Sequence, residues 1–369
     1  MRLISIDVLK EGMVLGRTIW NEAGHPLLKK GVVINERIIL RLQQLHTHYL
    51  YIDDEISKGI EVEDTVPVIV RNRALSTIKK SFQSLNGLST TNASYVLDNQ
   101  SKEIVSIVDE LLLAVTGNDE LLTVLADAYL FDEYLYQHSF QVTLYSIAIA
   151  RELGHSAEDL RLIAIGALLH DIGKIMVPKE IITKPGRLTH DEFDTMKMHT
   201  RYGFDVLRNL HSISLLVAHC AFQHHERIDG SGYPRGLVDF EIHPFAKIIG
   251  VADVFDAVTT NRVYREKMLP SQGLAIVEAG SGTIYDSRIV NALKKAVAHY
   301  PNGAILKLSD DRRGIVSKQD IINPMSPRIR IFEENDKLLP ATYEINLAEY
   351  PTVFIVKVET DYLVPAAFE

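Results

Sequence analysis

A helical periodicity runs through residues 160–171, whose sequence is LRLIAIGALLHD. Residues three and four positions apart lie on one face of an α-helix. In this stretch one such face contains Leu160, Ile163, Ala164, Ala167, Leu168 and Asp171. The pattern therefore predicts a buried helix whose apolar stripe ends in a carboxylate.

The helical pattern continues on both sides of this stretch, from Lys102 to about Tyr300. A helix is expected over residues 134–153, and one of its faces contains His138, Val142, Tyr145 and Ile149. Further along the chain, Thr189 and Glu192 match the capping box that opens a helix. The central part of the chain is therefore expected to be helical throughout.

The segments around the helical region differ from it in pattern. Residues 1–65 alternate short apolar runs with Gly and Asn, which predicts a small α+β module with a sensory or regulatory role. Residues 66–124 are expected to be a helical linker, in which Ser84–Asn99 is rich in Ser, Thr, Asn and Gly and predicts a mobile connection. A helical domain is placed at residues 125–300, and a short β-rich extension at residues 301–369. Strands of the extension are expected at Ala304–Leu308, Arg313–Ser317, Arg328–Phe332 and Thr352–Val358. The predicted fold class is mainly α.

The composition excludes several classes of protein. The chain has 369 residues, with 46% hydrophobic and 24% charged residues, as in soluble globular proteins. The net charge of -9 argues against a large surface for nucleic-acid polymers. Cys220 is the only cysteine, so an internal disulfide and a Cys-rich metal site are excluded. No apolar run reaches the roughly 18–20 residues of a membrane span, and we expect a cytoplasmic protein.

Groups that bind metal ions recur through the helical region. They are His170-Asp171, His199, His224-His225 and Asp253. Imidazole and carboxylate ligands without thiolates suit Fe, Mn, Zn, Co or Ni. A single histidine on an apolar helix face is more often a core or surface residue than a ligand. Side chains that point inward from several helices can, however, build a metal site in the core of a bundle.

Two metal ions about 3.5–4 Å apart can clamp the attacking and leaving oxygens of a phosphoryl displacement and activate a water as the nucleophile. Such a centre needs a carboxylate that bridges the two ions, and Asp171 is the obvious candidate. It also needs a cation for the charge on the phosphate, and Lys174 follows Asp171 by one helical turn or less.

Two sequence motifs carry a resemblance to a known family. They are His170-Asp171-Ile172-Gly173-Lys174, and residues 224–234, whose sequence is HHERIDGSGYP. Together they resemble the two signatures of the HD-GYP family, a branch of the HD-domain metal-dependent phosphohydrolases. Residues 184–189 and 253–259, followed by Tyr264-Arg265, match as well. The resemblance covers roughly residues 125–300.

The resemblance implies an all-helical domain that holds two or three divalent metal ions, commonly iron or manganese. Members of the family hydrolyse cyclic di-GMP to pGpG and often onward to GMP. By position in the motifs, the first metal would be held by His138, His170, Asp171 and Asp253. The second would be held by Asp171, His199, His224 and His225. Lys174 would contact the scissile phosphate or the attacking water, and the nucleotide would be bound by Lys174, Tyr233, Arg262 and Arg265.

One departure from the family pattern concerns the number of metals. Members with a third metal carry a Glu four residues before the first ligand histidine, whereas Tyr134 stands at that position here. We therefore expect two metals and a product that is largely pGpG. Close by the second motif, Glu226 and Arg227 are expected to form an ion pair that steadies the loop after them.

The function predicted from these residues is that of a cyclic di-GMP phosphodiesterase. Two alternatives stay open: a receptor that binds cyclic di-GMP but turns it over weakly, and an HD phosphohydrolase for another cyclic dinucleotide. Diguanylate cyclase domains, bound through Gly232-Tyr233-Pro234, and a second copy of the chain are considered as protein partners.

Overall fold

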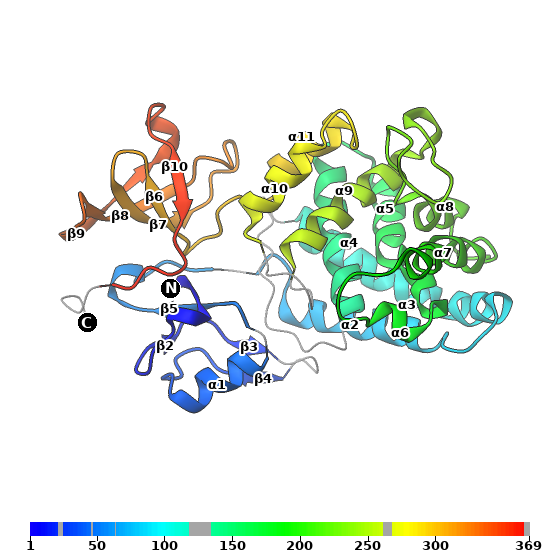
Figure 1. The fold of residues 1–369 in the computed structure, drawn as a ribbon, viewed down its shortest axis with the longest axis horizontal. Coiled ribbons are helices and arrows are strands. Elements are labelled where there is room, and N and C mark those ends of the chain that lie inside the picture. Colours follow the sequence, from blue (N-terminus) through cyan, green and yellow to red (C-terminus); the bar gives the residue numbers. More distant parts are fainter. Residues whose placement is uncertain (21–24, 46, 63, 118–133, 261–267, 365–369) are drawn as a thin grey trace.

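The computed structural model describes residues 1–20, 25–45, 47–62, 64–117, 134–260 and 268–364. Helices α2 to α11 gather on one side of the molecule, and the strands lie on the other side together with α1 (Figure 1). The predicted fold class is confirmed: the chain is mainly helical, with smaller β-containing parts at both ends. Within the described ranges, no helix has the length and apolar character that crossing a bilayer requires.

The helical region is built around one hydrophobic core. Its helices are α2 (Val68–Gln83), α3 (Thr90–Thr116), α4 (Tyr134–Glu152), α5 (Ala157–Leu169), α6 (Lys179–Ile182), α7 (His190–Leu207), α8 (Leu215–Gln223), α9 (Pro244–Thr259), α10 (Pro270–Ala279) and α11 (Ser287–Ala296). Phe82 and Leu97, from the segment predicted as a linker, belong to the same core as Ile163 and Phe255. α2 and α3 are therefore packed parts of the bundle, and the domain boundaries themselves stay predictions.

The mobile connection predicted at Ser84–Asn99 is wrong, because α3 begins inside it. The Ser89 side chain caps the helix N-terminus, and the Ser94 hydroxyl donates to a backbone carbonyl of α7 at 2.7 Å. Ala93 and Leu97 are fully buried. Burial against the bundle overrides the weak helix propensity of Ser, Thr and Asn.

The apolar stripe of residues 160–169 forms the buried face of α5, as the sequence predicts. The chain then tightens into a 3₁₀ turn, η4 (Ile172–Met176), so that His170 and Asp171 lie at the junction of the two elements. A Cβ atom at Gly173 would lie 2.0 Å from the carbonyl oxygen of His199. Only glycine lets η4 approach α7 this closely, and this contact sets the position of Asp171 relative to His199.

In its described residues, the N-terminal part contains two small antiparallel sheets and one α-helix. Its elements are β1 (Arg2–Ser5), β2 (Val14–Leu15), β3 (Ile19–Trp20), β4 (Pro26–Leu28), α1 (Glu36–Gln44) and β5 (Tyr49–Asp53). The larger sheet has the order β1-β5-β2, and β3 pairs with β4. Asn35 caps α1 by accepting from the backbone N–H of Ile38 at 2.9 Å.

The C-terminal part is one antiparallel sheet with the order β10-β6-β7-β8-β9. Its strands are β6 (Ile305–Leu308), β7 (Arg312–Lys318), β8 (Arg328–Glu334), β9 (Lys337–Asn346) and β10 (Ile355–Val358). The backbone N–H of Leu3 donates to the carbonyl of Gly303 at 2.9 Å, and that of Ser5 donates to Thr360 at 2.7 Å. The two β-containing parts are therefore hydrogen-bonded to each other, and they lie side by side in Figure 1.

We predict that Cys220 does not react with a thiol reagent in the native protein. The side chain is fully buried on α8, against Gly166 of α5, and burial raises the pKa of its thiol to about 12. Because the thiolate is the reactive form, labelling with Ellman's reagent at pH 8 should be negligible. The same protein in guanidinium chloride should react with one equivalent. Rapid native labelling would contradict the packing of α8 on α5.

Candidate metal centre

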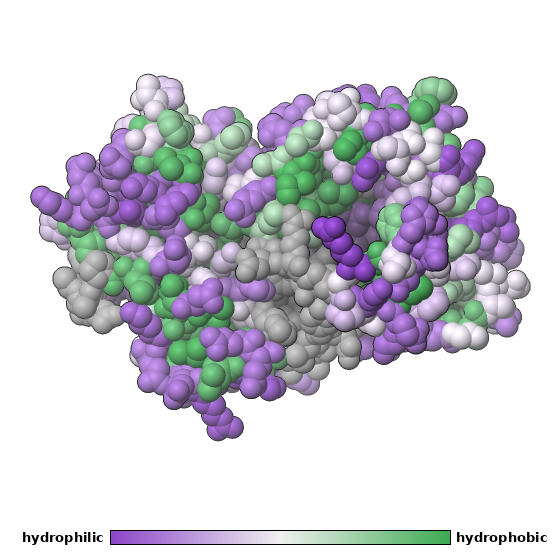
Figure 2. All heavy atoms as spheres, viewed as in Figure 1, coloured by the Kyte–Doolittle hydropathy of each residue, from purple (hydrophilic) through white to green (hydrophobic). Residues whose placement is uncertain are grey.

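All seven residues predicted as metal ligands come together in the helical region. His138 lies on α4, His199 on α7 and Asp253 on α9. His170 and Asp171 lie where α5 meets η4, and His224 and His225 follow α8 directly. In the space-filling view the surface is hollowed over the part of the molecule where α4, α5 and α7 lie (Figure 2). Residues distant in sequence thus form one cluster.

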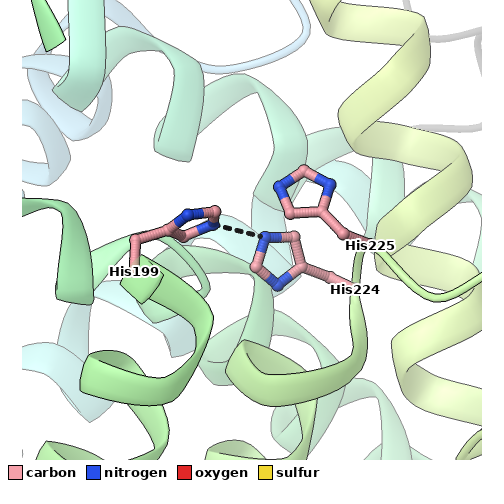
Figure 3. A group of neighbouring side chains, drawn as sticks. All are labelled: His199, His224 and His225. Atoms are coloured by element: carbon pink, nitrogen blue, oxygen red, sulfur yellow. Dashed lines mark hydrogen bonds between the residues drawn. The ribbon is translucent and has the colours of Figure 1, made fainter. Parts of the chain in front are cut away.

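The cluster contains two groups of candidate ligands. In each group one nitrogen or oxygen per residue lies within 4.8 Å of the others. The first group consists of His138, His170 and Asp171, and the second of His199, His224 and His225. The rings of the second group converge, with His199 Nε2 and His224 Nε2 3.4 Å apart (Figure 3).

Asp171 lies between the imidazoles of the first group and those of the second, with one carboxylate oxygen toward each set. Its Oδ2 is 3.5 Å from His138 Nε2 and 3.4 Å from His170 Nε2. Its Oδ1 is 3.5 Å from His199 Nε2 and 3.9 Å from His224 Nε2. This is the placement that a bridging carboxylate needs.

Asp253 also has one oxygen near each group. Its Oδ1 is 3.0 Å from His138 Nε2, and its Oδ2 is 3.6 Å from His225 Nδ1. The resemblance assigns Asp253 to the first metal, and the shorter of the two distances is on that side.

Backbone carbonyls orient three of the imidazoles. The Nδ1 atoms of His170, His199 and His224 lie 2.6, 2.6 and 2.9 Å from the carbonyl oxygens of Ala167, Met196 and Ala221, three residues earlier in each case. His170 and His224 directly follow helices, where the last carbonyls have no intrahelical partner. A hydrogen bond at Nδ1 places the proton there and leaves Nε2 as the ligand atom.

Burial keeps the histidines of the second group neutral. It lowers the pKa of His199 to about 4 and that of His225 to about 3, and it lowers the pKa of His224 well below the ordinary value. In the first group, burial lowers the pKa of His138, but hydrogen bonds with Asp253 and Asp256 outweigh it and raise this pKa to about 9. His138 must therefore lose a proton before its Nε2 can bind a metal ion.

The carboxylates of the cluster stay ionised although they are buried. Burial would raise the pKa of Asp171, but Lys174 and then His170 hold it well below the ordinary range. The pKa of Asp253 is likewise held well below its ordinary range, chiefly by His138, against the effect of burial. Lys174 reaches back from η4, and its Nζ lies 2.5 Å from Asp171 Oδ2.

The donor set fits divalent metal ions. His170 Nε2 and Asp171 Oδ1 are buried and have no hydrogen-bond partner among the described residues. Buried polar atoms in native structures are normally paired, and one explanation for an exception is an ion. Neutral imidazoles and ionised carboxylates are the forms that bind metal.

The loop after His225 is built around Tyr233. The Tyr233 ring lies 4.6 Å from that of His225, at an angle of 31° between the ring planes. A Cβ atom at Gly232 would lie 2.5 Å from the backbone N of Arg227, so the loop closes tightly only with glycine there. Glu226 steadies the loop by accepting from the backbone N–H groups of Arg235 and Leu237, at 2.8 and 2.9 Å.

The expected ion pair of Glu226 with Arg227 is not found among the described residues. The carboxylate of Glu226 is instead used by the loop backbone. Arg262 and Arg265, and the side chain of Tyr134, lie outside the described residues.

Sequence reasoning missed three residues near the cluster: Phe193, Lys197 and Asp256. The Phe193 ring centroid lies 6.0 Å from that of Tyr233, and Lys197 Nζ lies 4.7 Å from the Phe193 centroid. Asp256 Oδ2 lies 2.7 Å from His138 Nδ1. Asp256 follows Asp253 by three residues on a predicted helix, and this spacing could have indicated that both carboxylates lie on the same helix face.

Comparison with known proteins places this cluster in a family. Residues 125–289 match the family model described as HD domain. A cyclic di-GMP phosphodiesterase of Pseudomonas aeruginosa is 28% identical over 94% of this chain and 88% of the relative. A cyclic di-GMP phosphodiesterase of Thermotoga maritima is 35% identical over 66% of this chain and 65% of the relative.

A third relative is described as specific for a different nucleotide. It is the 3'3'-cGAMP-specific phosphodiesterase 3 of Vibrio cholerae, 40% identical over 46% of this chain and 36% of the relative. The region that matches the HD-domain model, residues 125–289, includes both motifs that the sequence shares with HD-GYP proteins. Residues 125–289 therefore form an HD domain, and the relatives named cyclic di-GMP phosphodiesterases support the HD-GYP branch for this domain.

Proposed function

We propose that this chain is a metal-dependent phosphodiesterase that hydrolyses cyclic di-GMP to pGpG. The observation that carries the proposal is the position of Asp171, whose two oxygens face two separate groups of imidazoles. The names of the relatives from Pseudomonas aeruginosa and Thermotoga maritima support the substrate.

We assign the ligands of the two proposed ions according to the two groups of residues. His138, His170, Asp171 and Asp253 would hold one ion, and Asp171, His199, His224 and His225 the other. Iron and manganese are the proposed metals, since the ligands are nitrogen and oxygen. When bound, two such ions supply a Lewis acid for the phosphodiester and lower the pKa of a water.

Lys174 supplies positive charge at the edge of the centre. Its ammonium group contacts Asp171, and the Lys174 side chain as a whole is 19% exposed, so part of it faces out of the cluster. A phosphate that approaches Asp171 from that side meets this charge. We assign Lys174 to the stabilisation of negative charge that develops on the phosphate.

Tyr233, Phe193 and Lys197 form a surface suited to a nucleobase. The Phe193 ring is 43% exposed, edge-on to Tyr233, and Lys197 Nζ lies 6.0 Å from the Tyr233 centroid. Aromatic faces stack nucleobases, and a nearby cation adds to the attraction for a nucleotide. We propose that one guanine of the substrate lies here, and that Arg262 and Arg265 bind elsewhere on the nucleotide.

A second candidate substrate is a mixed cyclic dinucleotide, because one relative is described as specific for 3'3'-cGAMP. The metal centre and the aromatic surface would serve either nucleotide. Turnover of equal concentrations of cyclic di-GMP and 3'3'-cGAMP by the same preparation separates the two. Faster hydrolysis of 3'3'-cGAMP would favour the second candidate.

Further proposals concern the location of the protein in the cell and its protein partners. We propose a cytoplasmic location, where cyclic dinucleotides are made. The loop Gly232-Tyr233-Pro234 is the surface we propose for diguanylate cyclase domains, because Pro234 is exposed beside the site. Dimerisation also stays a prediction.

Replacement of Asp171 by Ala should abolish hydrolysis and lower the metal content. The change removes the carboxylate whose two oxygens face imidazoles of both groups, so both proposed ions lose a ligand. Metal analysis of anaerobically purified protein should give two ions per chain for the wild type and fewer for D171A. Asp109→Ala, at an exposed ion pair on α3, should change neither quantity. Full metal content and activity in D171A would refute the proposed centre.

Lys174→Ala should lower kcat for cyclic di-GMP by about 10²–10³-fold, because one stabilising charge is lost. Its metal content should stay at the wild-type level, since the ammonium group is not a ligand. The control is Lys179→Ala, at an exposed position on α6, which should leave kcat unchanged. If the metals of K174A were lost instead, Lys174 would be structural.

Phe193→Ala should raise KM for cyclic di-GMP and leave kcat nearly unchanged. Loss of base stacking costs about 1–3 kcal/mol, or roughly 5- to 150-fold in affinity. The control is Phe240→Ala, because Phe240 is 86% exposed on η5 (Asp239–Glu241). An unchanged KM in F193A would place the base elsewhere.

A further inference from the structure

Asp256 is a fully buried carboxylate beside the proposed centre, and no role has been assigned to it so far. It lies on α9, one turn after Asp253. Its Oδ2 lies 2.7 Å from His138 Nδ1, and its Oδ1 accepts from the Thr260 hydroxyl at 2.8 Å. Both oxygens of this carboxylate are therefore used, one of them by a candidate ligand.

His138 differs in this respect from three other imidazoles of the cluster. The Nδ1 atoms of His170, His199 and His224 meet neutral backbone carbonyls. His138 Nδ1 meets an anion instead. A carboxylate partner fixes the tautomer and the ring direction of a ligand histidine, and it makes the histidine a stronger base toward a metal.

The two groups of ligands also differ in charge. The carboxylates of Asp171 and Asp253 lie beside His138 and His170, and Asp256 lies directly behind His138. The Lys174 ammonium, 2.5 Å from Asp171 Oδ2, offsets one of these three negative charges and leaves a surplus on this side. The second group has three imidazoles, which share the carboxylate of Asp171 and have Asp253 only at 3.6 Å. A dication is attracted more strongly to the side with more negative charge, and burial weakens the screening of that attraction.

We propose that Asp256 is a positioning residue that holds His138 Nε2 toward the first metal and makes the His138 side the tighter of the two metal sites. The first site then fills before the second and releases its ion last. This inference rests on the proposed metal centre. It concerns the order and affinity of metal binding, which the family membership does not determine.

A structural alternative is that Asp256 only ties α9 to α4. The two roles predict different results for Asp256→Asn, which keeps the size of the side chain and removes its charge. A structural tie would affect the unfolding temperature and leave the ratio of the two metal affinities unchanged. A positioning role weakens one site selectively.

The test is calorimetric titration of the metal-free full-length protein with Mn²⁺ under anaerobic conditions. The wild type should show two classes of sites, one tighter than the other. In D256N the tighter class should weaken by about 10- to 100-fold, the usual effect of losing such a partner. The weaker class should change little. Thr260→Val, which removes only the other hydrogen bond of Asp256, should have a smaller effect in the same direction.

The outcomes separate this inference from the proposed function. If the wild type bound no Mn²⁺, the metal centre itself would be refuted. If the wild type bound two ions and D256N kept the tighter class at wild-type affinity, only the role of Asp256 would be wrong. The circular dichroism spectrum and unfolding temperature of each variant show whether it is folded.

A second measurement uses the wild type alone and applies even if D256N fails to fold. In Zn²⁺-loaded protein with ¹⁵N-labelled histidine, the His138 ring should be bound through Nε2 and protonated at Nδ1. The signal is assigned by its loss in His138→Gln. A His138 ring bound through Nδ1, or a ring that is not bound, would overturn the proposal.

Discussion

The burial of the Asp171 carboxylate is the constraint on which the centre depends. An ionised carboxylate is costly to bury unless it is paired and hydrogen-bonded. Here α5 ends two residues before it, and Lys174 reaches back to it from η4. Imidazoles on α4, on α7 and directly after α8 approach it from two sides. The packing of the bundle and the geometry of the site are thus determined by the same residue.

Close backbone contacts make this arrangement possible. Gly173 allows η4 to touch α7, and at Gly250 a Cβ atom would lie 2.6 Å from the carbonyl oxygen of His224. The second contact brings α9, with Asp253 and Asp256, against the end of α8. Any larger residue at either position would have to move one of the groups that the cluster gathers.

The sequence predicted the parts of the structure that repeat a local pattern. The stripe of residues 160–169 predicted α5, and the motif residues from His138 to Asp253 indeed converge. The start of α3 was missed because burial, not propensity, stabilises it. β9 was missed because its residues are largely exposed and include Pro340, which weakens the strand pattern. Asp256 was missed because a carboxylate at that spacing fits a solvated helix face equally well, and only the packing of α4 shows its partner.

The cluster is hard to explain as a structural core. Five imidazoles and the carboxylates of Asp171, Asp253 and Asp256 meet inside the helical bundle, beside its apolar core. Leaving a buried polar atom such as His170 Nε2 without a partner costs about 1–3 kcal/mol. Apolar residues of similar volume would stabilise such a fold equally well or better. Divalent cations offset this cost, because they pair the carboxylates and the free imidazole nitrogens at once. Ions that bind the folded chain in preference to the unfolded one would also stabilise the fold, so the proposed centre would link stability to metal binding.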